Sequence, residues 1–279
     1  MNEFISASHD VAFKALFVRN ADILNAFLND SLELNLTDDD TIKILSPEDI
    51  PNFAEGKVSR FDAHVRTANR RYNVEMQASR TGFSAERVLY YWSQLYGDGF
   101  ESGNRYEELD QTYSINVLGF NYFKCKKYHS SFSIFEDERF ERLTDKLSIH
   151  IFELPKVPGE LIPGDHTQDW MEIIKADTEE ALETIRARTE NPMINKAIDS
   201  IYRLNADERL REQIRVQRKA ELDYGNDMAV AKAKGIEIGE ARGIEIGEAK
   251  AYSDVVENMR RNGFSEEQIK LIVGAGYKD

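Results

Sequence analysis

Hydrophobic and polar residues alternate along two neighbouring stretches, which predicts a pair of β-strands at residues 58–67 and 71–78. Shorter runs predict four more strands, at residues 41–45, 112–120, 129–135 and 146–154. Apolar residues recur with helical spacing elsewhere and predict helices at residues 8–18, from 22 onward, and at 84–101, 178–188 and 207–224. This order of elements indicates a mixed α/β fold, a mixed β-sheet flanked by helices, followed by an α-helical C-terminal appendage.

Local residues predict where these helices begin and end. Ser8 and Asp22 are placed to cap the first two helices, and the long helix is expected to start at Ser84. Near the end of the chain, Gly263 is expected to terminate one helix. Ser265 and Gln268 have the spacing of a capping box for the next helix.

The two alternating strands bring a pair of carboxylates together. With a two-residue turn at Ala68 and Asn69, Asp62 falls opposite Glu75 on the polar face, with β-carbons roughly 5 Å apart. A shift of one residue would mix polar and apolar side chains on both faces, so this register is self-consistent. Opposed carboxylates repel, and a cation such as Mg²⁺ relieves that repulsion with two carboxylates and a backbone carbonyl as ligands. A solvated sheet face with scattered charge is the alternative.

Composition narrows the class of protein. The chain has 279 residues, 41% of them hydrophobic, and a formal net charge of -14, which argues against a protein that coats nucleic acid non-specifically. Local basic patches remain compatible with a nuclease. Cys125 is the only cysteine, which excludes an internal disulfide and a cysteine-rich zinc site. Without a long apolar run or a signal pattern, we expect a cytoplasmic protein with no membrane partner.

Two helices carry polar residues on one face. On the long helix, Arg87, Tyr91 and Gln94 form a stripe that either faces a substrate or is simply solvated. On the first helix, Asp10 and Lys14 lie four residues apart and share a face, as a surface ion pair would also do.

Basic residues gather at two points near the predicted hairpin. One cluster lies at its tip and the other follows the 112–120 strand. Either could contact phosphate, or could protect sheet edges by charge. The members are Arg66, Arg70 and Arg71 in the first cluster, and Lys124, Lys126 and Lys127 in the second.

An eight-residue repeat follows residue 229. Residues 235–242 and 243–250 have glycine at every fourth position. Glycine costs about 1 kcal/mol per helical position, so a flexible spacer competes with a marginal helix that self-association would stabilise. We favour the helix, and with it a homo-oligomer formed through this repeat.

Five motifs in order resemble the Rpn-type recombination-promoting nucleases, a branch of the PD-(D/E)XK nuclease superfamily also described as transposases. The motifs lie within the first 156 residues. They read DVAFKALF from Asp10, KVSRFD ending at Asp62, VEMQ with Glu75 and Gln77, RVLYYW from Arg87, and LPK from Leu154. The resemblance implies a bacterial protein with a restriction-endonuclease-like core at residues 1–156. The pattern alone separates the rest of the chain into a helical region at 157–228 and the repeat with terminal helices at 229–279.

The resemblance also implies an activity and a site. It implies a DNA endonuclease that uses Mg²⁺, with Mn²⁺ as an alternative, and that leaves 5′-phosphate and 3′-hydroxyl ends. The metal ligands would be Asp62, Glu75, the backbone carbonyl of Met76, and Asp10. Gln77 would orient water, and Lys14, Arg60 and Arg87 are candidates for the positive charge. Arg87, Tyr91 and Gln94 would face the substrate.

Two residues depart from the superfamily pattern. Phe61 stands where the superfamily name has proline, and Gln77 stands where it has lysine, although this branch carries glutamine there. Glutamine orients water but brings no charge. A catalytically weak protein that acts as a DNA-binding or assembly module is therefore the alternative function.

Overall fold

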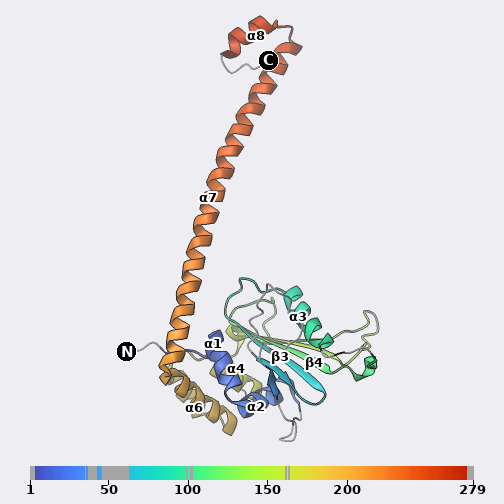
Figure 1. Cartoon of the computed structure of the whole chain (residues 1–279), viewed down its shortest axis with the longest axis vertical. Coiled ribbons are helices and arrows are strands. Elements are labelled where there is room, and N and C mark those ends of the chain that lie inside the picture. The colour runs from blue at the N-terminus through green and yellow to red at the C-terminus, as the bar shows by residue number, and fades with distance from the viewer. Residues whose placement is uncertain are drawn as a thin grey trace. The chain divides into compact units, whose positions relative to one another are not determined.

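The computed structural model describes residues 4–34, 36, 43–45, 63–98, 100, 103–160, 162 and 164–274. The chain divides into two compact units, Met1–Ile214 and Arg215–Asp279 (Figure 1). The first unit contains a mixed sheet with helices on both faces, and the second is helical. This architecture confirms the predicted α/β fold with a helical C-terminal region.

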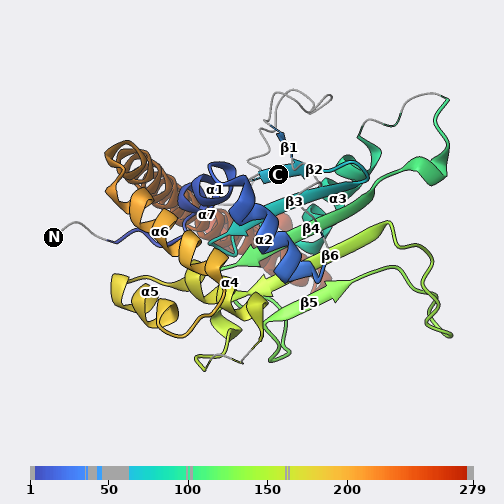
Figure 2. The same cartoon turned by 90° about the horizontal axis from the view of Figure 1, so that it is seen from below.

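The sheet has six strands in the order β1-β2-β3-β4-β6-β5 (Figure 2). Strand β3 pairs parallel with β4, and β4 pairs parallel with β6, whereas the other neighbours are antiparallel. The predicted strand at 129–135 is too long, because Phe135 forms an isolated bridge with Arg142 instead. The strands are β1 Lys43–Leu45, β2 Ala63–Arg66, β3 Arg70–Gln77, β4 Gln111–Leu118, β5 His129–Phe132 and β6 Leu147–Glu153.

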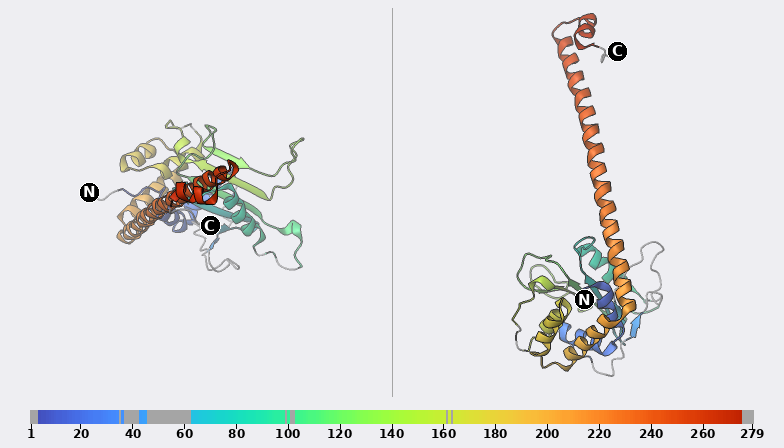
Figure 3. Two further views of the ribbon diagram at one scale, coloured as in Figure 1. Left: turned by 90° about the horizontal axis from the view of Figure 1, so that it is seen from above. Right: turned by 90° about the vertical axis from the view of Figure 1, so that its left-hand side faces the viewer.

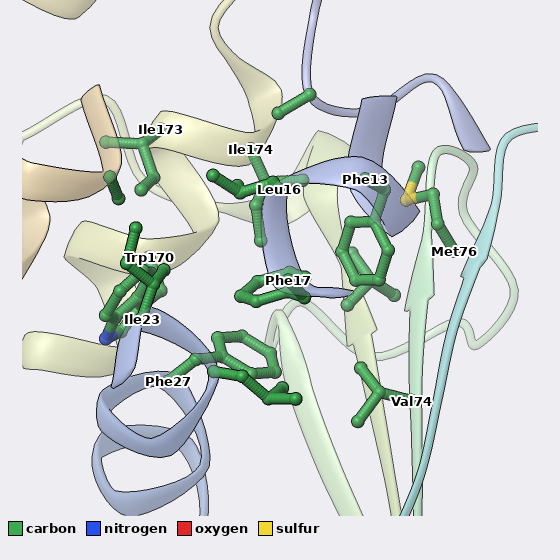
Figure 4. Packing of buried hydrophobic residues seen from close by; sticks show 14 of the residues in the cluster. Phe13, Leu16, Phe17, Ile23, Phe27, Val74, Met76, Trp170, Ile173 and Ile174 are labelled. Carbon is green, nitrogen blue, oxygen red and sulfur yellow. The ribbon is translucent and has the colours of Figure 1, made fainter. Parts of the chain in front are cut away.

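One face of the sheet is covered by helices from both ends of the first unit. Side chains of α1 and α2 share one core with those of α4 and α6 (Figure 4). Trp170 from α4 lies fully buried against Phe17 and Phe27, and Val74 and Met76 reach this core from the sheet. The helices are α1 Asp10–Val18, α2 Ala21–Leu32, α4 His166–Lys175, α5 Glu179–Arg186 and α6 Pro192–Ala206.

Helix α3, Ala85–Gly97, packs on the opposite face of the sheet. It ends four residues before the predicted boundary and buries Val88 and Leu95 as expected. The smaller core beneath it takes alternate residues of β6, because side chains on a strand point to opposite faces in turn. The β6 residues are Leu147, Ile149 and Ile151, and Leu118 joins them from the end of β4.

Capping residues agree only in part with the predictions. The hydroxyl of Ser84 accepts a hydrogen bond from the Arg87 backbone N–H, as predicted. The predicted cap at Ser8 is wrong, because His9 precedes α1 and the Ser8 hydroxyl instead meets that of Ser6 at 2.9 Å. The predicted cap at Asp22 is also wrong, since this residue lies inside α2 and forms an ion pair with Lys196.

The repeat is helical along its whole length. Helix α7 runs from Glu208 to Arg261, 54 residues, without interruption (Figure 3). A Cβ at any glycine of the repeat would meet nothing within 4 Å apart from the adjacent backbone of its own helix, and the isoleucines beside these glycines are exposed. The unbroken course of α7 favours the predicted helix over the flexible spacer.

A short helix follows at the C-terminal end. Gly263 adopts a positive φ of 84° after α7, and Ser265 and Gln268 form the predicted capping box of α8, Glu266–Val273. Among the described residues, no helix combines the length and the apolar character needed to cross a membrane.

Candidate functional site

The β2–β3 hairpin has the register that the sequence predicts. Ala63 pairs with Val74, and Arg66 pairs with Arg71. The backbone N–H of Thr67 donates to the Arg70 carbonyl at 2.9 Å, which closes the turn at residues 68–69. Asp62 and Arg60 lie outside the described residues, so the pairing of Asp62 with Glu75 stays a prediction.

Glu75 lies near the carboxyl end of β3, half-buried on the face that α3 covers. The side-chain amide of Asn73 donates to its Oε1 atom at 3.0 Å. Burial raises the pKa of the Glu75 carboxyl, while this hydrogen bond and the charge of Arg87 act in the opposite direction. The Asn73 amide thus fixes the carboxyl group in a site where burial disfavours its charged form.

Buried polar side chains surround Glu75, and the sequence pattern gave them no role. Asn73 is 1% exposed. Asn116, the residue of β4 that pairs with Glu75, is 2% exposed. The Asn116 amide donates to the Ser114 hydroxyl at 3.1 Å. Burial, and to a smaller extent the charge of Lys14, lowers the pKa of His64 to about 4. The sequence held one signal for Asn73. It lies two residues before Glu75 on the same strand, so both side chains point to the same face.

Gln77 ends β3 two residues after Glu75 and shares its face. Its amide donates to the Ser79 carbonyl at 3.2 Å. Met76, between them, points into the core on the other face, where Figure 4 shows its side chain beside Phe13. The metal role predicted for the Met76 backbone carbonyl stays a prediction, and the side chain is excluded from it by its place in the core.

The substrate residues predicted on α3 occupy different positions. The Arg87 guanidinium lies 5.4 Å from the centre of the Tyr91 ring and donates to the Gly82 carbonyl at 3.3 Å. Its positive charge also lowers the pKa of Glu75, against the larger effect of burial. Tyr91 is half-buried under Arg87, and Gln94 is exposed further along the helix.

The two predicted residues of α1 are used differently. Asp10 opens the helix, and its carboxylate accepts hydrogen bonds from the Val11 backbone N–H at 2.7 Å. The Nδ1 atom of His9 lies 3.1 Å from the same carboxylate oxygen. Lys14 is exposed, and its charge reaches His64 on β2. Lys14 is therefore near the hairpin, whereas the role of Asp10 as a ligand stays a prediction.

Two of the three arginines in the basic cluster at the hairpin tip lie within ion-pair distance of acidic residues. Arg71 is buried and forms ion pairs with Asp98 at 2.7 Å and with Asp110 at 2.9 Å. Arg66 lies 3.7 Å from Asp110. The interpretation of Arg71 as a phosphate contact is therefore wrong, because this buried guanidinium is paired with two partly buried carboxylates.

Two observations bear on whether a cation fits beside Glu75. Burial disfavours the isolated charge of Glu75, and a cation would restore it. The Oδ1 atom of Asn73 is buried and has no hydrogen-bond partner among the described residues. Those residues contain no group of three or more histidine, cysteine or acidic side chains placed to hold a metal. A complete site thus needs a ligand from outside them, and Asp62 is the sequence candidate.

The mixed sheet and the carboxylate on its central strand are those of a nuclease-fold protein. The sequence model of the PD-(D/E)XK nuclease family transposases matches residues 7–231. The chain belongs to this family, as the five motifs predicted. No curated protein and no solved structure matches the chain. The boundaries predicted at residues 156 and 228 stay predictions.

Proposed function

We propose that the protein is a metal-dependent DNA endonuclease that hydrolyses phosphodiester bonds in connection with a mobile element or recombination. The observation that carries this proposal is Glu75, a half-buried carboxylic acid that accepts a hydrogen bond from Asn73 on a central strand of a nuclease-fold sheet. Membership of the nuclease family supports the same reaction class. DNA is the substrate class that the family indicates.

Mg²⁺, or Mn²⁺ in its place, would be held by Asp62, Glu75, the Met76 carbonyl and Asp10. The hairpin register supports Asp62 as the partner of Glu75 because the paired residues continue toward that position. The bound cation would supply charge stabilisation at the scissile phosphate and an acidified water. Asn73 would keep the Glu75 carboxylate in one orientation through its hydrogen bond.

The remaining site residues would act on water and on phosphate. Gln77 would orient the attacking water, because its amide offers both a donor and an acceptor. Lys14 and Arg87 would supply the positive charge that Gln77 lacks. Arg87 is suited to hold a phosphate through its forked donors, with Tyr91 and Gln94 lining the same side of α3.

The test is cleavage of supercoiled plasmid by the full chain. We expect nicking with Mg²⁺ or Mn²⁺ and none after chelation of the metal. Loss of activity in an Asp62→Ala variant is expected because the carboxylate pair is broken. Cleavage that survives this substitution would remove Asp62 from the site. A wild-type protein inactive with both metals would favour the alternative function, a catalytically weak DNA-binding or assembly module.

A Gln77→Lys variant is expected to retain or raise the rate of cleavage. Lysine places a positive charge near the oxygen on which charge develops in the transition state. The measurement is the initial rate of plasmid nicking at fixed metal concentration. A folded variant with no activity would contradict this prediction, and would show that Gln77 makes a contact that lysine does not reproduce.

We also propose that the chain forms a homo-oligomer through the repeat in α7. The exposed isoleucines support this proposal, as does the cost of glycine in an isolated helix. A chain ending at Ala229 is expected to stay folded and to lose its oligomers, as measured by light scattering. Equal molar masses for both chains, apart from the missing residues, would reduce the repeat to a spacer.

A further inference from the structure

The loop between β4 and β5, residues 119–128, carries three lysines and no acidic residue, and we name it the basic loop. We propose that the basic loop binds the DNA backbone next to Glu75 and Gln77. This inference rests on DNA being the substrate, as in the proposed function. The three side chains, all exposed, are Lys124, Lys126 and Lys127.

The basic loop begins at the same end of the sheet as the candidate site. Strands β3 and β4 are parallel, and Gln77 pairs with Leu118 at their carboxyl ends. The backbone N–H of Gly119 then donates to the Gln77 carbonyl at 2.9 Å. A Cβ at Gly119 would lie 3.0 Å from the Ala78 carbonyl oxygen, so a larger residue here would push the two strand ends slightly apart. The first residue of the loop is thereby joined to the last residue of β3.

A buried ion pair holds the middle of the basic loop. Glu153 is fully buried, and its carboxylate accepts hydrogen bonds from the backbone N–H groups of Tyr122 and Phe123. The Lys156 ammonium donates to the second Glu153 oxygen at 2.6 Å and to the Phe123 carbonyl at 2.7 Å. The loop is therefore ordered before any ligand arrives, which reduces the entropy lost on binding. The pairing also removes the Glu153 charge from the face that DNA would approach.

Aromatic contacts fix the loop against the segment that joins β3 to α3. The Phe83 ring lies edge-on to Tyr122, with ring centres 4.9 Å apart. The Arg80 guanidinium lies 5.9 Å from the centre of the Tyr122 ring and adds another exposed positive charge. The same segment leads into α3, whose first turns carry Arg87. Basic side chains thus extend from the basic loop through Arg80 to Arg87, the arginine whose charge lowers the pKa of Glu75.

The cluster at the hairpin tip is a natural comparison, because it has as many basic residues at the other end of β3. Two of its arginines, Arg66 and Arg71, lie within ion-pair distance of Asp110. Neutralised cations release few counterions on binding DNA, so they contribute little affinity. The basic loop itself contains no acidic residue, and its one buried carboxylate partner, Glu153, is paired with Lys156. In a chain with a net charge of -14, such a segment repels a polyanion less than the rest of the surface does.

The first experiment compares two double variants with equal changes of charge, Lys124→Gln with Lys126→Gln, and Arg66→Gln with Arg70→Gln. Binding of a fluorescent DNA duplex to the full chain is followed by anisotropy, with Ca²⁺ replacing Mg²⁺. Each lost phosphate contact lowers the salt slope by about 0.9, so the lysine variant should lose about two units and at least about tenfold in affinity. The arginine variant should stay within about twofold of wild type. Equal effects of the two double variants would overturn the proposal.

The second experiment uses Cys125, the only cysteine, which lies exposed within the basic loop. Saturating DNA should slow its reaction with a maleimide several-fold, and high salt should restore the rate. An unchanged rate at saturation would overturn the proposal. If the wild type binds DNA through the loop but cleaves nothing, the inference stands and the nuclease proposal falls. If it cleaves DNA and the lysine variant binds like wild type, the inference alone falls, and absence of DNA binding overturns both.

Discussion

A Glu75→Gln variant is expected to lose DNA cleavage by at least about a thousandfold while its stability stays equal or rises. Glutamine keeps the shape of the side chain but cannot neutralise a cation. Burial opposes the charge of Glu75 in the folded protein, so a neutral side chain removes a desolvation cost. The measurements are the rate of plasmid nicking and the free energy of unfolding in urea without metal.

The matched control for this variant is Glu86→Gln. Glu86 is an exposed glutamate in the first turn of α3, so the same change of charge is made near Arg87 but in water. We expect this control to cleave at close to the wild-type rate. Cleavage by the Glu75 variant at a similar rate would show that the carboxylate is not a ligand. A large loss of stability would show that the carboxylate mainly supports the fold.

A Trp170→Ala variant is expected to lower the free energy of unfolding by about 3–5 kcal/mol. The indole is fully buried, lies 5.7 Å from Phe27 between ring centres, and donates from Nε1 to Asp30 at 2.7 Å (Figure 4). Its removal leaves a cavity and takes from the Asp30 carboxylate one of the two side-chain donors that it has, the other being the Asn191 amide at 3.2 Å. Urea unfolding followed by circular dichroism measures the change.

A Tyr224→Ala variant serves as the control, because this side chain is exposed on α7. Its free energy of unfolding is expected to change by less than about 0.5 kcal/mol. A Trp170 variant with an equally small change would mean that α4 contributes little to the core around α1 and α2. The predicted domain boundary at residue 156 would then gain support, since helices beyond it would be dispensable.

Local patterns were sufficient to predict the hairpin that carries Glu75. Alternation defined the faces of both strands, and a two-residue turn left one register in which apolar residues share a face. The structure reproduces that register from Ala63 to Arg66. The capping box at Ser265 was predictable for the same reason, because both partners lie within four residues.

Contacts between distant residues were beyond reach of the sequence pattern. Arg71 looked like an exposed cation at a hairpin tip, but it pairs with Asp98 and Asp110, which follow it by 27 and 39 residues. Periodicity states which face of a strand a residue occupies, and not which residue from another element covers that face. The hydrogen bond between Asn73 and Glu75 was closer to prediction, since the two share a face.

The exposed isoleucines of α7 determine what kind of assembly the repeat can form. At 3.6 residues per turn, Ile238, Ile244 and Ile246 lie about 200°, 80° and 280° around the helix axis from Ile236. A two-stranded coiled coil needs its apolar residues along one seam, and these four residues form none. Each helix therefore offers apolar contacts in several directions at once. Chains that associate through these helices would not stop at a symmetric dimer. The mean particle size would therefore grow with protein concentration.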